Sequence, residues 1–155
     1  MLTTNAERRC RLLFENKMND KDVIRVQVPG ALEYIAIVRR AVDAVGEQIH
    51  LAPRARAAVE LAVGEACNNA VFHARPCEDR NGCVMIVACR VRPDALEIDV
   101  TNQGNGFHPD APARMPRAED LSDHGRGRAL MEMSMDGVEY LSENGNTTVR
   151  LRKNR

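Results

Sequence analysis

The chain has 155 residues, enough for one domain with a hydrophobic core and too few for two. Its 22 basic and 22 acidic side chains cancel, and it has two Tyr, three Phe and no Trp, which argues against binding to nucleic acid or to an anionic membrane surface. No apolar stretch reaches the roughly 18 residues that span a bilayer, and the polar N-terminus lacks the apolar core of a secretory signal, so we expect a cytoplasmic protein.

The first half of the chain predicts one strand followed by two helices. Residues 1–21 show no clear period and form a tail or a short helix. Residues 23–28 alternate apolar and polar side chains, as a half-buried strand does, and Pro29 ends that strand. Apolar residues then return at helical spacing over 31–49 and, more densely, over 53–74. Both of the last two segments are therefore predicted to be helices.

The second half predicts two hairpins, a lid and a short helix. Segments 83–91 and 95–101 are apolar runs separated by a turn, which is typical of a hairpin. The stretch that follows has no period and is too long for an ordinary loop, so a lid is expected at about 104–124. A helix over 127–135 comes next. The closing hairpin is expected over 137–142 and 147–153. This order predicts an α+β sandwich, in which a mixed, mostly antiparallel sheet carries helices on one face.

The five cysteines are odd in number and include no closely spaced pair of the kind that binds zinc. Cys67 lies in an apolar helical pattern, and Cys83 and Cys89 lie in an apolar strand pattern. We therefore expect buried or free thiols, as in a reducing cytoplasm.

A polar stripe runs along the helix predicted over 53–74. Leu61, Glu65, Asn69 and His73 follow one another at intervals of four residues and so share one side of the helix. The rest of this helix is nearly all apolar, so most of its surface must be buried. The stripe faces either solvent or a cleft, and spacing alone does not separate the two. In a cleft, Asn69 offers an oxygen ligand for Mg²⁺ and Glu65, about 6 Å away along the axis, offers a general base.

Two glycine pairs flank the predicted lid. Gly104 and Gly106 follow the strand 95–101, where they either form a tight turn or let the backbone approach a flat ligand. Gly125 and Gly127 lie where the next helix begins, and the free N–H groups and dipole of a helix start favour phosphate. Neither pair fits the P-loop or the GxGxxG pattern, and each alone is weak evidence for a nucleotide site.

In this order, the stripe, the two glycine pairs and the lid resemble the N, G1 and G2 boxes of the GHKL (histidine kinase-like) ATPase superfamily. Within it, the chain is most similar to anti-sigma-factor serine/threonine-protein kinases of the RsbW and SpoIIAB type. The resemblance covers about residues 22–153, and segments 60–74, 125–136 and 144–153 carry it. It implies that 22–155 form a histidine kinase-like ATPase domain with a Bergerat-type two-layer sandwich, in which ATP lies between the helices and the sheet under a mobile lid.

The resemblance also implies a role for each matching residue. Glu65 becomes the general base and Asn69 the Mg²⁺ ligand of a site for ATP. The residues implied to bind the rest of the nucleotide are Asn102, Gly104 and Gly106 at the adenine, Gly125, Arg126 and Gly127 at the phosphates, and Thr148 near the adenine side of the sheet.

Two positions depart from the family pattern. Asn102 stands where the family usually has an Asp that accepts a hydrogen bond from the adenine amino group. An amide oxygen can still accept that bond if the amide is turned the right way, but without the assistance of a charge. Arg128 stands where an apolar residue is common, and it either contacts phosphate or lies on the surface.

By resemblance, the chain is expected to act in a partner-switching system. Such kinases hold a sigma factor inactive and phosphorylate a serine on a small STAS-type antagonist, and they tend to form homodimers. A non-catalytic interaction module that binds ATP weakly or only as a structural ligand is the alternative, favoured by Asn102. An ATPase or the catalytic domain of a histidine kinase is a third, weaker possibility.

Overall fold

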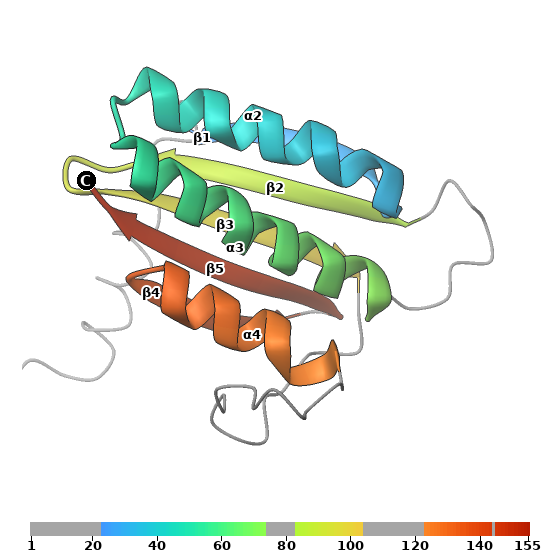
Figure 1. Cartoon of the computed structure of the whole chain (residues 1–155). Helices are drawn as coiled ribbons and strands as arrows, with labels where there is room; N and C mark the ends of the chain where they lie inside the picture. Colours follow the sequence, from blue (N-terminus) through green and yellow to red (C-terminus); the bar gives the residue numbers. More distant parts are fainter. Residues whose placement is uncertain (1–22, 74–82, 104–122, 144) are drawn as a thin grey trace, which may run out of the picture.

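A computed structural model describes residues 23–73, 83–103, 123–143 and 145–155 of the chain. In this part, three α-helices lie side by side over one face of a five-stranded sheet, which confirms the predicted two-layer α+β sandwich (Figure 1). The strands are β1 (Val23–Pro29), β2 (Val84–Val91), β3 (Ala95–Gln103), β4 (Gly137–Glu143) and β5 (Asn146–Asn154). The helices are α2 (Ile35–Gln48), α3 (Pro53–Phe72) and α4 (Asp123–Ser134), and a 3-10 turn, η2 (Leu32–Tyr34), precedes α2.

The strand order in the sheet is β1-β2-β3-β5-β4, and every pairing between the described strands is antiparallel. The sheet was expected to be mixed, and the connections explain the difference. Two helices, α2 and α3, connect β1 to β2, so that β2 runs antiparallel to β1. A single helix, α4, connects β3 to β4, which run in the same direction, but β5 lies between them and pairs with both.

The hydrophobic core lies between the helices and the sheet. Alternation along the strands directs one set of side chains towards the helices, and this set is apolar in the middle of the sheet. It comprises Met85, Val87 and Cys89 of β2, Leu96, Ile98 and Val100 of β3, and Val149 and Leu151 of β5. The helices contribute Val38 and Val42 from α2, Ala62, Val63, Ala66 and Cys67 from α3, and Met131 from α4.

Helix α3 is the central helix, with α2 on one side and α4 on the other (Figure 1). Pro53 begins it, where a missing N–H is not needed. Its buried side is built mainly of small residues, Ala62, Ala66 and Ala70, together with Val63 and Cys67. Glu65 and Asn69 of the polar stripe lie on the side of α3 that faces Gly127 of α4.

The opposite face of the sheet, which no described helix covers, carries a row of ion pairs. The Asp99 carboxylate is 6% exposed and accepts hydrogen bonds from Arg90 at 2.6 Å and from Arg150 at 2.8 and 3.0 Å. Burial alone would raise the pKa of Asp99, but the hydrogen bonds from Arg150 and Arg90 outweigh burial and lower it. Glu97 is paired in the same way with Arg92 and Arg152.

The cysteines differ in part from expectation. Cys67 and Cys89 are free and buried, as predicted, and burial raises the pKa of the Cys67 thiol to about 12 and that of Cys89 to about 11. Cys83 is disulfide-bonded, whereas it was expected to be a buried or free thiol. Its sulfur partner lies outside the described residues, and no spacing rule in the sequence indicates such a bond.

None of the helices in the described ranges combines the length and the apolar character that crossing a bilayer requires.

Candidate functional site

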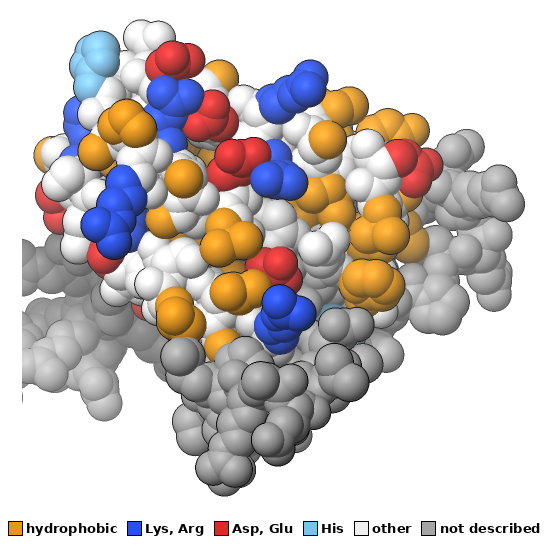
Figure 2. Space-filling view, viewed as in Figure 1, with side chains coloured by type: hydrophobic (Ala, Val, Ile, Leu, Met, Phe, Trp, Pro, Cys, Tyr) orange, Lys and Arg blue, Asp and Glu red, His pale blue; other side chains and the backbone are white. Residues whose placement is uncertain are grey.

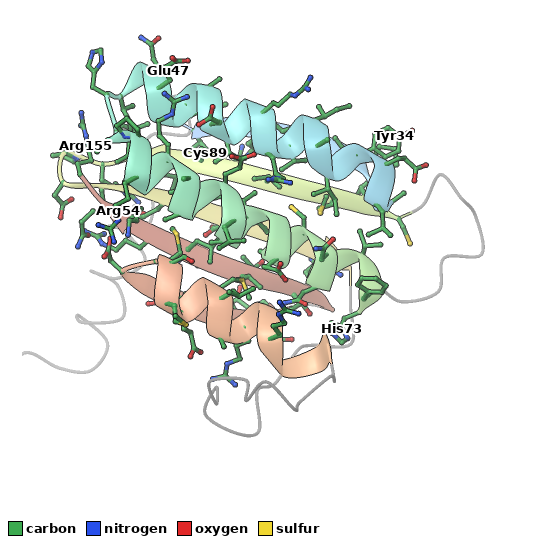
Figure 3. All side chains as sticks on the ribbon, in the orientation of Figure 1. Tyr34, Glu47, Arg54, His73, Cys89 and Arg155 are labelled. Carbon is green, nitrogen blue, oxygen red and sulfur yellow. The ribbon has the colours of Figure 1, made fainter. Side chains whose placement is uncertain are left out.

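A cavity of about 630 Å³ lies between α3 and α4. Its size falls within the roughly 300–1,000 Å³ range of small-molecule sites in proteins. The lining residues from α3 and its end are Glu65, Asn68, Asn69, Phe72 and His73, and those from α4 are Arg126, Gly127 and Leu130. Figure 3 shows His73 at the end of α3, beside the start of α4. Most of the polar stripe thus lines a cavity, as the cleft interpretation predicts.

Glu65 and Asn69 converge on one point of α4. A methyl group built on Gly127 would lie 2.6 Å from Oε2 of Glu65 and 3.8 Å from Oδ1 of Asn69. The first distance is shorter than real contacts, so a side chain at position 127 would displace the carboxylate. Gly127 is therefore required for close approach of α4 to the two polar groups, and both oxygens lie on the same side of the cavity.

Helix α4 begins at Asp123, four residues before the predicted start at Gly127. Two glycines within one turn lower helix propensity, so the sequence pattern resembles a loop there. Gly125 lies in the first turn, where backbone N–H groups have no partner within the helix and can bind an anion. Gly127 lies in the second turn, where its N–H is used by the helix, so its contribution is space rather than a donor. Arg126 is exposed and lines the cavity.

Asn102 lies at the end of β3, under the last turns of α3. The residue is 7% exposed, and Nδ2 of its side chain donates a 2.6 Å hydrogen bond to the backbone carbonyl of Ala70. The last four carbonyls of a helix lack partners within the helix, and Asn102 satisfies one of them. A carbonyl only accepts hydrogen bonds, so this contact determines which way the amide is turned. Oδ1 is left as the acceptor for a ligand.

A second, small cavity of about 20 Å³ adjoins Asn102 beneath α3, large enough for a single water molecule. It is lined by Asn69 and His73, which also line the larger cavity, and by Thr147 of β5. Asn102 and Thr147 face each other in the strand pairing. The predicted adenine side and the predicted phosphate side are thus joined through Asn69 and His73.

Thr148 does not line either of these cavities. Its hydroxyl lies 2.8 Å from that of Thr101, on the sheet face away from the helices. The residue that reaches the small cavity is Thr147, one position earlier. The alternation of side chains along the strand indicates that Thr147 faces the helices, because Val149 and Leu151 are apolar and lie on the same side of the strand as Thr147. The role was assigned to Thr148 instead of Thr147 because the prediction did not use the phase of the neighbouring apolar residues.

Arg128 turns away from the cavity. Its Nε donates to Oε1 of Glu132 at 2.8 Å, and its guanidinium carbon lies 5.5 Å from the centre of the Tyr140 ring. The Arg128 side chain is 18% exposed and its contacts are with protein groups outside the larger cavity, so the structure does not support the phosphate contact. Burial also raises the pKa of Tyr140 to about 12.

Part of the predicted site lies outside the described residues. Gly104 and Gly106 belong to this part, as does the lid, apart from Asp123 and His124, which form the start of α4. Their roles remain predictions. Asn68 and Phe72, by contrast, line the larger cavity and were not predicted, because each lies one position before a residue of the stripe and so falls outside it.

Comparison with known proteins places the chain in a family. Residues 28–153 match the family model described as a histidine kinase-like ATPase domain. The chain is 34% identical to the serine-protein kinase RsbW of Bacillus subtilis (strain 168) over 138 residues, which cover 83% of this chain and 84% of the relative. It is 33% identical to RsbW of Bacillus velezensis over 135 residues, 81% and 82% of the two chains.

Two solved structures share the fold. One contains the RsbU and RsbW domains of a Mycobacterium tuberculosis protein, with a TM-score of 0.64 and 17% identity over 86% of this chain; the match spans 33% of that longer protein. The other is the SiaB-SiaC complex from Pseudomonas aeruginosa, with a TM-score of 0.56 and 13% identity over 100% of this chain and 99% of that one. The chain belongs to the histidine kinase-like ATPase (GHKL) superfamily and, within it, to the anti-sigma-factor serine kinases of the RsbW type.

Proposed function

We propose that the chain is a protein serine kinase that transfers the γ-phosphoryl group of MgATP to a serine of an anti-sigma-factor antagonist. The observation that carries the proposal is the convergence of Glu65 and Asn69 on Gly127 at the wall of the larger cavity. A general base and an oxygen ligand for Mg²⁺ are two of the groups that enzymes use for phosphoryl transfer to a hydroxyl. Membership of the RsbW family supports the same activity, since these relatives are named serine-protein kinases.

The residues present fit the nucleotide. Asn69 would hold Mg²⁺ through Oδ1, and the ion would supply charge to neutralise the phosphates. The first turn of α4, with Gly125, and the Arg126 side chain would bind phosphate oxygens. At the other end, Oδ1 of Asn102 would accept a hydrogen bond from the exocyclic amine of adenine, which requires the small cavity beside Thr147, the size of one water molecule in this structure, to widen.

In the transfer step, the serine hydroxyl oxygen of the acceptor attacks the γ-phosphorus. The bond between that phosphorus and the oxygen bridging to the β-phosphate breaks, and ADP leaves. Glu65 accepts the hydroxyl proton, so the attacking oxygen gains negative charge as it bonds. The protein's main contribution is to position the reactants and their charges, as in other phosphoryl transfers.

The test is the substitution Glu65→Gln, which preserves size and removes the base. With purified MgATP and a purified STAS-type antagonist as acceptor, we expect phosphoryl transfer to fall by roughly 10²–10⁴-fold. The dissociation constant of MgATP, measured by calorimetry, should change little, because Glu65 is not assigned to nucleotide binding. The Ser→Ala variant of the acceptor provides the control for the phosphorylated position.

Two outcomes would contradict the proposal. Transfer that is unchanged in Glu65→Gln would show that the base has been assigned wrongly. No binding of MgATP at millimolar concentration would remove the kinase and leave a protein-interaction module, which is the second candidate. The observation that favours this candidate is Asn102, whose neutral amide replaces a charged adenine anchor and is partly used by Ala70.

The partners follow from the same proposal. A member of this family would also bind a sigma factor and would form a homodimer, and the antagonist would displace the sigma factor only when its serine is not phosphorylated. Nucleic acid and membranes are not proposed as partners, because the 22 basic and 22 acidic side chains leave no net field to attract them.

A further inference from the structure

Helix α4 carries residues that the proposed function places at the phosphates, yet its beginning is intrinsically weak. Gly125 and Gly127 lie within its first two turns, and glycine lowers the stability of a helix relative to alanine. At the other end of α4 the sheet holds the last turn, since Nζ of Lys153 on β5 donates a hydrogen bond to the carbonyl of Ser134 at 2.9 Å. The first turns need a contact of their own to be held in one position.

Arg128 supplies such a contact between α4 and β4, which lie next to each other in Figure 1. The guanidinium carbon of Arg128 lies 5.5 Å from the centre of the Tyr140 ring, and its Nε donates to Oε1 of Glu132 at 2.8 Å, one helical turn further along. The Arg128 side chain is 18% exposed, which is low for a charged side chain. A cation over an aromatic ring is attracted more strongly when both are partly removed from water. Arg128 and Tyr140 thus join the second turn of α4 to the edge strand of the sheet.

Three consecutive residues of α4 face three different parts of the protein. Arg126 lines the larger cavity, Gly127 lies against Glu65 of α3, and Arg128 lies over Tyr140 of β4. Successive residues of an α-helix differ by about 100° in direction, because a turn contains 3.6 residues. The contact at position 128 therefore determines the rotation of α4 about its own axis, and with it the directions of positions 126 and 127.

We propose that Arg128 is a positioning residue, which stacks on Tyr140 and so holds the first turns of α4 in the rotation that presents Arg126 and the backbone N–H groups near Gly125 to the phosphates of MgATP. Arg128 does not touch the nucleotide and acts through these groups. The inference rests on the proposed function and adds a residue to it. An apolar residue is common at this position in the family, so the contact is a feature of this chain.

Binding of an anionic partner is the other use that a basic residue on α4 could have. A site of that kind gathers Lys and Arg side chains on one surface. Figure 2 shows the helical face of the molecule, where the basic side chains are scattered among acidic and hydrophobic ones. The charge of Arg128 is also compensated by Glu132. These observations favour a role within the domain over a role in binding a partner.

The experiment begins with Arg128→Leu, which removes the cation and leaves an apolar side chain. The dissociation constant of MgATP is measured by calorimetry at a temperature well below the thermal midpoint of every variant, so that only folded molecules are compared. We expect this constant to rise about fivefold or more, which is the lower end of the usual coupling between two sites. We expect kcat to fall by as much as roughly 10²-fold, the effect of a misplacement of about 1 Å. The KM for the acceptor protein should stay within twofold.

Conservative variants separate the stacking from the charge. Arg128→Lys keeps the charge but loses the planar guanidinium, so its dissociation constant should lie between those of the wild type and Arg128→Leu. Tyr140→Phe keeps the ring and should bind MgATP as the wild type does, whereas Tyr140→Leu removes the ring and should resemble Arg128→Leu. The double variant of Arg128→Leu and Tyr140→Leu should be no weaker than either single variant, because both remove the same contact.

Arg54→Leu is the matched control, because it makes the same chemical change at an exposed position. Arg54 lies in the first turn of α3, at the opposite end of that helix from His73 (Figure 3), and lines neither of the two cavities described above. Its substitution should leave the dissociation constant of MgATP and kcat unchanged.

Each result decides the role of Arg128. If Arg128→Leu lowers only the thermal midpoint and binds MgATP as the wild type does, Arg128 is merely structural and the proposal is wrong. Additive effects in the double variant would also overturn it, since Arg128 would then not act through Tyr140. If the wild type binds MgATP but phosphorylates no acceptor, the kinase is overturned, and the dissociation constants still decide the positioning role. If the wild type does not bind MgATP at millimolar concentration, both proposals are wrong.

Discussion

The side chain of Asn102 has two partners with different chemistry. Its amino group donates a hydrogen bond to the carbonyl of Ala70 at the end of α3, and the residue also lines the small cavity, where its carbonyl oxygen could accept a bond from a ligand. The family's usual aspartate would place a negative charge against that carbonyl, near the negative end of the helix dipole. The change from Asp to Asn is thus suited to this structure, and it keeps an acceptor for adenine.

The substitution Asn102→Asp restores the family residue and should nevertheless destabilise the protein. A buried carboxylate cannot donate to Ala70, so we expect the free energy of unfolding at pH 7 to fall by about 1–3 kcal/mol. The deficit should shrink in acid, because a protonated carboxyl group can donate the missing hydrogen bond. Urea unfolding at several pH values measures both effects. A variant that is as stable as the wild type at pH 7 would show that the hydrogen bond to Ala70 contributes nothing.

Residue positions were predicted unevenly. Glu65 and Asn69 could be found because helical spacing determines which side chains share a side, whatever the rest of the chain does. Thr147 was missed by one position, since a period of two moves every side chain to the other face when the count slips by one. The use of Asn102 by Ala70 could not be predicted, because it depends on where the end of α3 lies above β3.

At the scale of the elements, β3 and β5 carry charge on the sheet face away from the helices. Asp99 on β3 lies between Arg90 of β2 and Arg150 of β5, so one carboxylate connects three strands. Because both arginines lower its pKa, Asp99 stabilises the fold at pH values above the aspartate pKa of the unfolded chain, about 4. This stabilisation is lost as the pH falls below that value, through the lower pKa of the folded state.

The substitution Asp99→Asn should therefore reduce stability in a pH-dependent manner. We expect a loss of about 2 kcal/mol at pH 7, the usual value for hydrogen bonds to a charged group, and a smaller difference from the wild type below about pH 3, where the wild-type carboxylate is itself being protonated. Thermal unfolding at the two pH values measures the difference. Asp94→Asn is the control, because Asp94 forms an ion pair with Arg152 on the same face of the sheet but is 73% exposed. Its substitution should lower the free energy of unfolding by about 0.5 kcal/mol or less. Equal losses in both variants would contradict the role of burial.

The helices and strands were predicted mostly within a few residues, since each has its own period and ends at Pro, Gly or a turn. The strongest case is α3, where the predicted 53–74 became Pro53–Phe72. The predicted start of α4 was four residues too late, because two glycines close together are typical of a loop. In the structure, packing of α4 against α3 outweighs the low helix propensity of these glycines. Local pattern cannot report packing of this kind.

At the scale of the whole molecule, the core encloses two thiols. Cys67 of α3 is fully buried and Cys89 of β2 is 2% exposed, and burial raises the pKa of each well above that of a free thiol. A thiol that is both inaccessible and protonated reacts slowly, so these two groups report opening of the whole domain.

We expect Cys67 and Cys89 to resist a thiol reagent at about pH 8, where free thiols with a pKa of about 8.5 react readily. Both should become reactive together as urea unfolds the protein, with the same midpoint as the loss of helical circular dichroism. Mass spectrometry of the labelled peptides follows each site separately. Labelling of either cysteine well below the unfolding midpoint would indicate local opening between α3 and the sheet.

The global arrangement could be predicted only as a class. A helical layer on a sheet follows from the order of the elements, but the position of β5 between β3 and β4 does not, because nothing in the pattern of a strand names its partner. The disulfide at Cys83 was likewise not predicted, since cysteine spacing does not determine pairing.

The place of β5 has a consequence for how the protein folds. This strand follows β4 in the sequence, yet it pairs with β3 as well as with β4, so β3 keeps an unpaired edge until β5 inserts. Pairing across such a separation in sequence is slow, because the entropy of closing a long loop is lost before the contacts form. Until then β3 presents a hydrophobic strand edge to other chains. The insertion of β5 between β3 and β4 thus also protects the newly synthesised chain from aggregation.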